Sequence, residues 1–358
     1  MRLRLEPRPA PSRALLVLAP VAAAALTALF GIVLFALIGH DPAAAFHSYF
    51  VKPFLTAYGL AELAVKATPL CLCAVGLAIG FRGNVWNIGA EGQLTAGAVC
   101  GGGLALAFHG EGGPWLLPAM VLAGAAGGMA WGAIPAFLKT RFEANEILTS
   151  LMLSYVAVLL LGWLVHGPWR DPAGFRFPES RQFDPEATLP LLVAGTRLHL
   201  GVLLAPLAVA AAWVVMRHSL LGFQVRVVGS AEAAARYAGF SRNRVVWVSF
   251  LLAGGAAGLA GLGEVAGPIG QLLPTISPGY GFAAIIVAFL GRLNPLGVLA
   301  ASILMALLYI GAETAQMDMG VPPAVSGVFQ GLLLFLLLAA DALARYRIRL
   351  DRPSRAPA

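Results

Sequence analysis

The sequence predicts an all-α polytopic membrane protein with about ten transmembrane helices, some of them discontinuous, and with both termini in the cytoplasm. Three observations predict this class. Hydrophobic residues make up 59% of the 358 residues and charged residues 11%, whereas a soluble protein of this length needs far more polar surface. The apolar residues are grouped in long runs, and most basic residues lie in alternate segments between those runs.

The long apolar runs define the predicted spans. A membrane-spanning helix needs about 20 mostly apolar residues, and a shorter run, 280–291, is counted as part of an interrupted span. The first run is too long for a signal-peptide core and has no convincing cleavage site, so we expect it to remain a helix. We expect a single transmembrane domain over 1–358, with its bundle at 14–344. The predicted full-length spans are 14–38, 59–80, 90–108, 116–138, 146–166, 199–216, 245–266, 297–313 and 323–344.

The distribution of lysine and arginine predicts which segments face the cytoplasm. Cytoplasmic loops of membrane proteins carry an excess of these residues. With the N-terminus inside, 18 of the 24 lie in cytoplasmic segments, five lie outside and Lys66 lies within a span. This bias predicts both termini inside and an even number of crossings. The basic residues are scattered rather than grouped on one face, so no nucleic-acid partner is expected.

A long extracytoplasmic loop is predicted at 167–198, where proline and charged residues are frequent. It has two interpretations, a docking surface for an extracytoplasmic partner or an irregular solvated loop.

A second long loop, 217–244, is predicted to be cytoplasmic and contains the stretch SAEAAARYAG. This stretch predicts a short helix: Ser230 can cap its N-terminus, Glu232 suits the positive end of the helix dipole, and Gly239 can end it. Its small alanine face suits docking into a groove on another protein. A plain cytoplasmic turn and helix is the alternative.

Glycines spaced four apart predict close helix packing. Gly124 with Gly128, and Gly254 with Gly258, have the small-xxx-small spacing that lets helix backbones approach closely in lipid. The spacing predicts a tightly packed bundle and carries no information about a substrate.

The stretch GFRGNVWNIGAEGQ, residues 80–93, places polar side chains between two apolar runs. Gly83 and Gly89 permit the chain to leave helical geometry, and Asn87 is placed to cap a new helix that begins near 88–90. Irregular backbone at membrane depth is tolerated only where protein or a water-filled cavity satisfies its polar groups. The candidate substrate-pathway residues of this break are Asn84, Trp86, Asn87, Glu91 and Gln93.

A second interruption is predicted at 267–282, GPIGQLLPTISPGYGF. Its three prolines prevent a continuous helix, and the run that follows is too short to cross a membrane alone. Paired discontinuities in the two halves of a transporter indicate the substrate pathway. The candidate pathway residues of this second break are Gln271, Ser277 and Tyr280.

The two breaks offer hydrogen bonding and stacking. Neutral amides and hydroxyl groups, with the aromatic faces of Trp86 and Tyr280, suit a sugar or a nucleoside better than an ion. The alternative is that the amides only cap helix ends and contact no ligand.

No catalytic constellation is found in the sequence. The six histidines include no pair at metal-binding helical spacing, and no G-x-x-x-x-G-K-[ST] loop is present, so no metal or other cofactor is expected on this chain. Energy must then come from another subunit or from an ion gradient. For a gradient-driven transporter, Glu91 is the candidate proton carrier, because Glu62, Glu264 and Glu313 lie near predicted membrane ends, where a solvated carboxylate is ordinary.

Three blocks of the chain resemble the permease subunits of bacterial ABC importers, in the branch that serves nucleosides and simple sugars such as ribose. GLAIGFRGNVWNIGAEGQLTAGA (76–98) resembles the signature region of these subunits. GQLLPTISPGYGFAAIIVAFLGRLNPLG (270–297) resembles a second block, and GSAEAAARYAGFSRNRVVWVSFLLAGGAAGLAG (229–261) resembles the region of the coupling helix.

The resemblance implies a multi-pass permease subunit of the bacterial inner membrane that works by alternating access. It implies a second permease subunit, identical or homologous, two cytoplasmic ATPase subunits that hydrolyse ATP with magnesium, and an extracytoplasmic substrate-binding protein. The alternatives are a gradient-driven secondary transporter, an exporter-type or lipid-directed ABC subunit, and a membrane enzyme, which would need a catalytic constellation that the sequence does not show. The residues that the resemblance places in the ATPase-coupling helix are Ala231, Glu232, Ala233, Ala234, Arg236, Tyr237 and Gly239.

The chain departs from the EAA-x-x-x-G loop of other ABC importers. That loop places a glycine six residues after the glutamate, whereas Gly239 lies seven residues after Glu232. The details of that motif are therefore not carried over, and the departure is compatible with the sugar and nucleoside branch.

Overall fold

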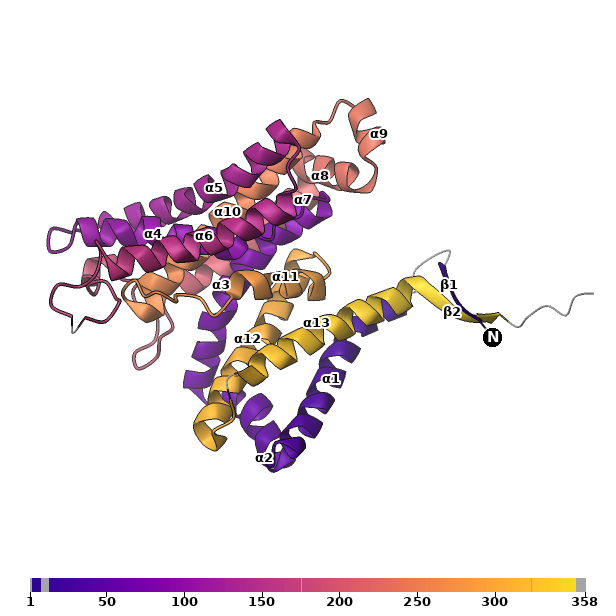
Figure 1. Ribbon diagram of the computed structural model, residues 1–358, viewed down its shortest axis with the longest axis horizontal. Helices are drawn as coiled ribbons and strands as arrows, with labels where there is room; N and C mark the ends of the chain where they lie inside the picture. Colours follow the sequence, from indigo (N-terminus) through magenta and orange to yellow (C-terminus); the bar gives the residue numbers. More distant parts are fainter. Residues whose placement is uncertain (1, 8–12, 175, 323, 352–358) are drawn as a thin grey trace, which may run out of the picture. The chain divides into compact units, whose positions relative to one another are not determined.

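The computed structural model describes residues 2–7, 13–174, 176–322 and 324–351 (Figure 1). The chain forms two compact units. The larger unit is Phe54–Leu307, and the smaller combines Met1–Pro53 with Leu308–Ala358. Helix α12, Pro295–Met319, begins in the larger unit and ends in the smaller one.

The larger unit is built from helices, as predicted. Each predicted span in this part of the chain corresponds to a helix, including the short run at 280–291. The helices are α3 (Ala57–Arg82), α4 (Ala90–Ala107), α5 (Leu116–Phe142), α6 (Glu146–His166), α7 (Leu204–His218), α8 (Leu220–Ser230), α9 (Glu232–Tyr237), α10 (Arg242–Glu264) and α11 (Tyr280–Leu290), with short turns η3 (Pro185–Ala187), η4 (Leu200–Leu203) and η5 (Val265–Ile269).

Six helices in the described part of the chain are long and apolar enough to cross a membrane. The protein is therefore a polytopic membrane protein with an all-α transmembrane bundle. The number of crossings and the cytoplasmic position of both termini remain predictions. The six candidate spans are Ala57–Arg82, Leu116–Phe142, Glu146–His166, Leu200–His218, Arg242–Ile269 and Pro295–Met319.

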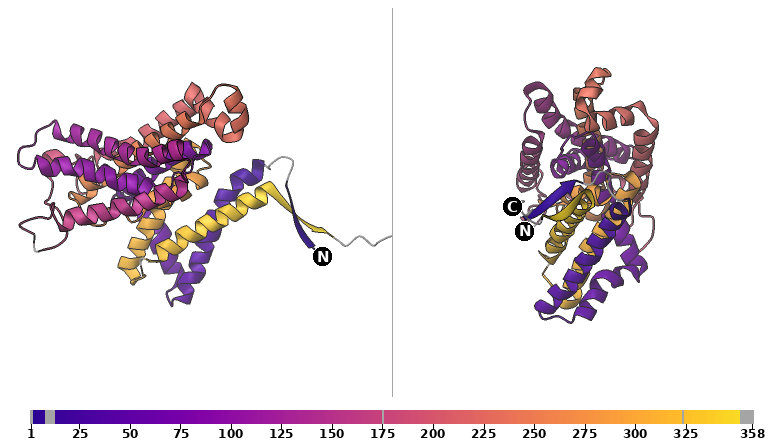
Figure 2. Two further views of the ribbon diagram at one scale, coloured as in Figure 1. Left: turned by 45° about the horizontal axis from the view of Figure 1, so that its top comes forward. Right: turned by 90° about the vertical axis from the view of Figure 1, so that its right-hand side faces the viewer.

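In the larger unit, α4, α5, α6 and α10 run side by side (Figures 1 and 2). Small residues allow close approach. A Cβ added at Gly128 would lie 2.1 Å from the Gly254 carbonyl oxygen, and one added at Gly97 would lie 2.2 Å from Gly258 Cα. The predicted tight packing through Gly128, Gly254 and Gly258 is thus confirmed, because any larger side chain would force these helices apart.

The smaller unit holds α1 (Arg13–Leu37), α2 (Pro42–Phe46), the π-helical η1 (His47–Val51), the second half of α12, and α13 (Ala324–Arg345). The short turn η2 (Lys52–Phe54) follows η1. The core of the smaller unit is aromatic. The ring centroid of Tyr49 lies 4.8 Å from that of Phe329, and its hydroxyl group donates a hydrogen bond of 2.7 Å to the Leu308 carbonyl. Phe35 completes the cluster, 5.9 Å from both rings.

Two short strands, which the sequence analysis did not predict, join the ends of the described chain. β1 (Arg2–Pro7) pairs antiparallel with β2 (Tyr346–Asp351), with Arg2 opposite Asp351 and Pro7 opposite Tyr346. RLRLEP and YRIRLD alternate charged and apolar residues, the period-2 pattern of a strand. In the sequence, their arginines were interpreted only as topology signals.

Candidate functional site

The first break separates α3 from α4. Helix α3 ends at Arg82, and Asn84 adopts a left-handed backbone conformation with φ of 56°, which short polar side chains tolerate. The Val85 N–H returns to the Gly80 carbonyl at 3.0 Å, and the chain then runs without helix to Ala90. The predicted departure from helical geometry at this point is confirmed.

Asn87 and Gln93 hold the start of α4. Asn87 Nδ2 donates to Gln93 Oε1 at 3.0 Å, and Gln93 Nε2 donates to Asn87 Oδ1 at 3.3 Å. Asn87 Oδ1 also accepts the Gly89 N–H at 2.9 Å. The cap position itself is Gly89, not Asn87 as predicted, because Asn87 reaches the helix from just outside it. Both side chains are buried and hydrogen-bonded to each other, so in this structure they stabilise the break.

The second break follows α10. The helix continues as the π-helical η5, ends at Gly270 in the left-handed conformation, and is followed by irregular chain up to α11. Ser277 Oγ accepts the N–H groups of Gly279 at 3.1 Å and Tyr280 at 2.9 Å and so fixes the backbone at the start of α11. The 11 residues of α11 span about 16 Å, half of a membrane's hydrocarbon core, so the predicted half-length helix is confirmed.

The two breaks meet at Glu91. This side chain, in the first turn of α4, accepts the Gly281 N–H through Oε2 at 2.7 Å and hydrogen bonds to Ser277. The contact is close, because a Cβ added at Gly281 would lie 2.2 Å from the Glu91 nitrogen. A single carboxylate therefore lies at the N-termini of two helices, where the helix dipoles favour negative charge.

Trp86 is part of an aromatic stack and not an open platform. Its ring centroid lies 5.2 Å from that of Phe81 and 6.1 Å from that of Phe289. The exposed Asn84 accepts a hydrogen bond of 3.0 Å from Trp86 Nε1 through its side-chain oxygen. The stack joins the first break to α11, which carries Phe289, so it reinforces the contact made by Glu91.

Gln271 lies apart from the other predicted pathway residues. Gln271 Nε2 donates to Glu179 at 3.1 Å, within the predicted extracytoplasmic loop. That loop is anchored by backbone hydrogen bonds, from Ser180 to Leu272 at 2.9 Å and from Phe183 to Gly270 at 2.8 Å. The loop therefore folds against the second break and is hydrogen-bonded to it.

The expectation that Glu62 and Glu264 are solvated carboxylates is wrong. Both are buried, with 4% and 7% of their surface exposed. Glu62 accepts a hydrogen bond of 2.9 Å from Arg197 Nε and forms a second bond to the same guanidinium. Sequence reasoning missed this pair because Arg197 is 135 residues away and only the fold brings it to α3.

The predicted coupling helix forms as α9, Glu232–Tyr237, with Gly239 just beyond it in the left-handed conformation at φ of 78°. The Phe240 N–H returns to the Ala235 carbonyl at 2.9 Å, so the predicted stop at Gly239 is confirmed. The predicted Ser230 cap is wrong, because Ser230 ends α8 and donates to the Val227 carbonyl.

One face of α9 is buried and the rest is exposed. Ala235 is 1% exposed, whereas Tyr237 is 98% exposed. Glu232 pairs with Arg242 at 3.1 Å on the surface. The other residues predicted for coupling, Ala231, Ala233, Ala234, Arg236 and Gly239, are all exposed. A fully exposed tyrosine at the tip of a short helix is suited to insertion into a partner's pocket.

The end of α8 lies directly against the first break. A Cβ added at Gly229 would lie 1.9 Å from the Arg82 carbonyl oxygen and 3.1 Å from Gly83 Cα. Val225, one turn earlier on α8, faces Gly83. This contact was not predicted, because no sequence signal pairs Gly229 with the end of a helix about 150 residues earlier.

No group of three or more His, Cys, Asp or Glu side chains that could hold a metal ion is found in the part of the chain that the structure describes. The chemistry of the two breaks is hydrogen bonding by amides, hydroxyl groups and one carboxylate.

Comparison with known proteins places the chain among transport permeases. The family described as "Branched-chain amino acid transport system / permease component" matches residues 59–338. A glucose ABC transporter permease protein of Haloferax volcanii is 39% identical, over 90% of this chain and 87% of its own length. A guanosine ABC transporter permease protein of Bacillus subtilis is 30% identical, over 91% and 94%. A nucleoside ABC transporter permease protein of Lactococcus lactis is 26% identical, over 90% of each. No solved structure gives a significant match.

Proposed function

Since the chain belongs to the family of permease components of branched-chain amino acid transport systems, we propose that it is the permease subunit of an ATP-driven ABC importer for nucleosides or related simple sugars. The substrate class is supported by the relatives named for glucose, guanosine and nucleosides, which share most of their length with this chain. The protein is a multi-pass protein of the inner (plasma) membrane.

The observation that carries the proposal is the continuous set of contacts from α9 to the two breaks. α9 presents the exposed Tyr237, and α8, which precedes it, touches Arg82 through Gly229. The break that begins at Gly83 leads to Glu91, which holds the N-terminus of α11. If a partner displaced α9, the movement would therefore reach the helices at both breaks, because the backbone segments between them are closely packed.

The mechanism that follows is alternating access. Closure of two partner ATPases on ATP would displace α9, and the helices around the two breaks would rock between outward-open and inward-open states. ATP hydrolysis takes place on those partner subunits, and we assign no cofactor to this chain. Its remaining partners are a second permease subunit, identical or homologous, and an extracytoplasmic substrate-binding protein that releases substrate at the loop 167–198.

The side chains assigned to the pathway have two kinds of role. The side chains of Asn87, Gln93 and Ser277 form hydrogen bonds that stabilise the helix ends at the breaks. Glu91 links the two breaks to each other. Asn84 is exposed and Trp86 is half-buried, so these are the side chains of the first break that substrate can reach in a transport intermediate. Tyr280 is buried at the start of α11, and Gln271 lies under the outer loop.

The test is gentle purification of the tagged full-length chain from its native cell, followed by identification of the proteins that accompany it. We expect an ATPase subunit and a second multi-span protein, and ATP hydrolysis stimulated by nucleosides or sugars with their binding protein.

Tyr237→Ala should lower the amount of ATPase subunit that copurifies with the chain at least about tenfold, as expected for loss of an aromatic anchor. Tyr155→Ala, which removes an exposed tyrosine of α6, should leave it unchanged. Uptake by the lone chain in proteoliposomes under a proton gradient would overturn the proposal.

A further inference from the structure

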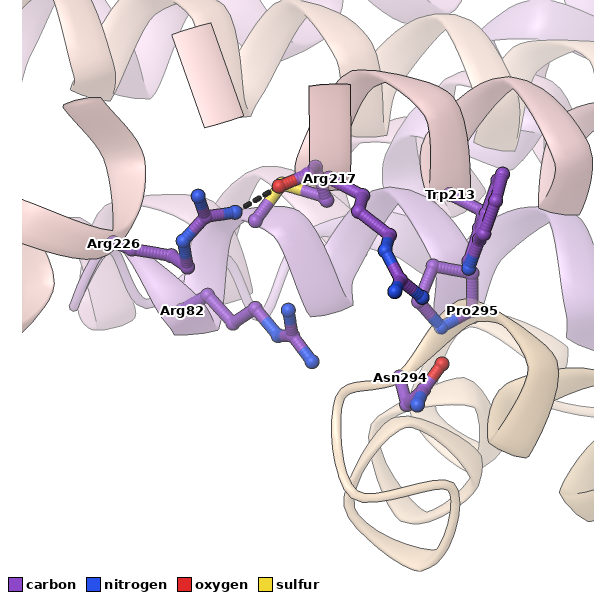
Figure 3. A pocket seen from close by; sticks show the side chains of 7 residues that line it. Arg82, Trp213, Arg217, Arg226, Asn294 and Pro295 are labelled. Carbon is purple, nitrogen blue, oxygen red and sulfur yellow. Dashed lines mark hydrogen bonds between the residues drawn. The ribbon is translucent and has the colours of Figure 1, made fainter. Parts of the chain in front are cut away.

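A basic pocket lies in the larger unit where α3, α7, α8 and the start of α12 come together (Figure 3). Its volume is about 230 Å³. It is lined by Arg82, Trp213, Met216, Arg217, Arg226, Asn294 and Pro295. Figure 3 shows the side chains of Arg82, Arg217 and Arg226, from three different helices, lining one pocket together with Asn294.

The charges of this pocket are not balanced within the described chain. Its lining contains three guanidinium groups and no carboxylate, and no ion pair joins Arg82, Arg217 or Arg226 to any acidic residue that the structure describes. Arg226 and Arg82 are close enough to repel each other. Three like charges around one hollow favour an anion that brings them together.

The arginines also have hydrogen-bond donors to spare. Arg226 uses one amino group for the Met216 carbonyl, the dashed bond in Figure 3. Arg217 lies over the Trp213 ring, 5.4 Å from its centroid, which leaves the edge of its guanidinium free of that contact. Each guanidinium carries five donors, and a phosphate group presents several acceptor oxygens in the geometry that guanidinium groups bind best.

The surroundings of the pocket indicate where that phosphate comes from. α7 ends at the pocket, and its outer face carries the exposed apolar residues Leu207 and Val214. Beyond the pocket, α8 presents Leu220 and Phe223, which are 67% and 47% exposed. Trp213 lies at the boundary between these apolar surfaces and the arginines, the position that tryptophan favours at a membrane interface.

We propose that this pocket binds the phosphate group of an anionic membrane lipid, whose acyl chains lie along the exposed apolar face of α7. The headgroup is held by Arg217 and Arg226, with Arg82 behind them. The predicted cytoplasmic position of all three arginines agrees with this site, because anionic lipids attract basic segments at that surface. A soluble phosphate would gain nothing from the apolar residues on either side of the pocket.

The proposal is tested on the purified full-length chain by native mass spectrometry, after delipidation and addition of phosphatidylglycerol or phosphatidylcholine. The wild-type chain should retain phosphatidylglycerol in preference to phosphatidylcholine. Arg217→Gln and Arg226→Gln should each weaken phosphatidylglycerol retention at least about fivefold, because each removes charge-assisted hydrogen bonds. Arg141→Gln is the matched control, since Arg141 is an exposed arginine at the end of α5, the helix end predicted to face the same side.

Two results would overturn the lipid assignment. Equal retention in the pocket variants and the control would show that no lipid is held there. Displacement of bound phosphatidylglycerol by millimolar inorganic phosphate, together with phosphate binding that the pocket variants lose, would assign the site to a free anion. The unfolding temperature of each variant in detergent micelles without phosphatidylglycerol checks that a loss of binding is not a loss of fold.

Discussion

The carboxylate of Glu91 accepts the N–H of Gly281 at 2.7 Å, so the second residue of α4 is bonded to the second residue of α11 across 190 positions of sequence. Each helix begins at one of the two breaks. A movement at the first break is therefore passed to the second without an intervening flexible segment. The same carboxylate is the one that a gradient-driven transporter would use as a proton carrier, so its substitution separates the two mechanisms.

We predict that Glu91→Gln retains substrate uptake to within about threefold of wild type, because the amide oxygen can still accept the Gly281 N–H. Glu91→Leu removes the acceptor and should reduce uptake at least about tenfold. Both are measured as initial rates of nucleoside or sugar uptake in cells, normalised to the amount of chain in the membrane. A proton carrier behaves differently: Glu91→Gln would then abolish uptake as completely as Glu91→Leu.

The contact between Gly229 and Arg82 gives a prediction about coupling. In Gly229→Ala the new methyl group has no space beside the Arg82 carbonyl, so α8 must move away from α3. We expect the ratio of substrate imported to ATP hydrolysed to fall at least about fivefold in proteoliposomes holding the whole transporter, while the subunits still assemble.

Gly162→Ala is the matched control for Gly229→Ala. A Cβ at Gly162, within α6, meets nothing within 4 Å, so the same substitution there should leave the ratio unchanged. An unchanged ratio in Gly229→Ala as well would remove this contact from the coupling path.

The helices were predictable because hydropathy and charge act locally along the chain. The start of α4 and the short α11 follow from the glycines and prolines around them, and α9 ends at Gly239 as its sequence indicates. The errors concern partners far apart in sequence. The buried Glu62 is paired with Arg197, and Gln271 bonds to Glu179 rather than to the other candidate residues. Neither pairing has a signature in the spacing of residues.

The buried amides of Asn87 and Gln93 also show that the sequence predicts a type of interaction but not the partner. Their residue types predict hydrogen bonding, and the structure adds that Asn87 and Gln93 bond to each other. We predict that Asn87→Ala lowers the free energy of unfolding by about 1–3 kcal/mol, because it leaves the Gln93 amide and the Gly89 N–H buried without that partner. The unfolding temperature in detergent measures the effect.

A double-mutant cycle tests the pair directly. The loss in Asn87→Ala with Gln93→Ala should be smaller than the sum of the two single losses, because either substitution already breaks the reciprocal bonds. Asn84→Ala, at an exposed position of the same break, is the control and should change the unfolding temperature little. Additive losses would mean that the two amides act independently.

His199 gives a prediction about pH. Its ring is 2% exposed between Gly201 and Gly267, with Glu264 lining the same small cavity, and its Nδ1 has no hydrogen-bond partner in the described chain. Burial lowers the pKa of His199, because the charged ring loses its hydration. The unfolded chain therefore binds this proton more readily. The contribution of His199 to stability is complete above its unfolded pKa of about 6.5 and is lost as the pH falls toward the lower folded pKa.

We expect the unfolding temperature of the wild-type chain, measured relative to that of His199→Gln at the same pH, to fall between pH 7.5 and pH 5.5, because the variant has no ring to protonate. Contributions that both proteins share cancel in this comparison, so the difference reports the histidine. His166→Gln, at an exposed histidine that ends α6, should keep the pH response of the wild-type chain. If His199→Gln and wild type lose stability in parallel, His199 is not charged on unfolding in this range, and the buried ring contributes to packing alone.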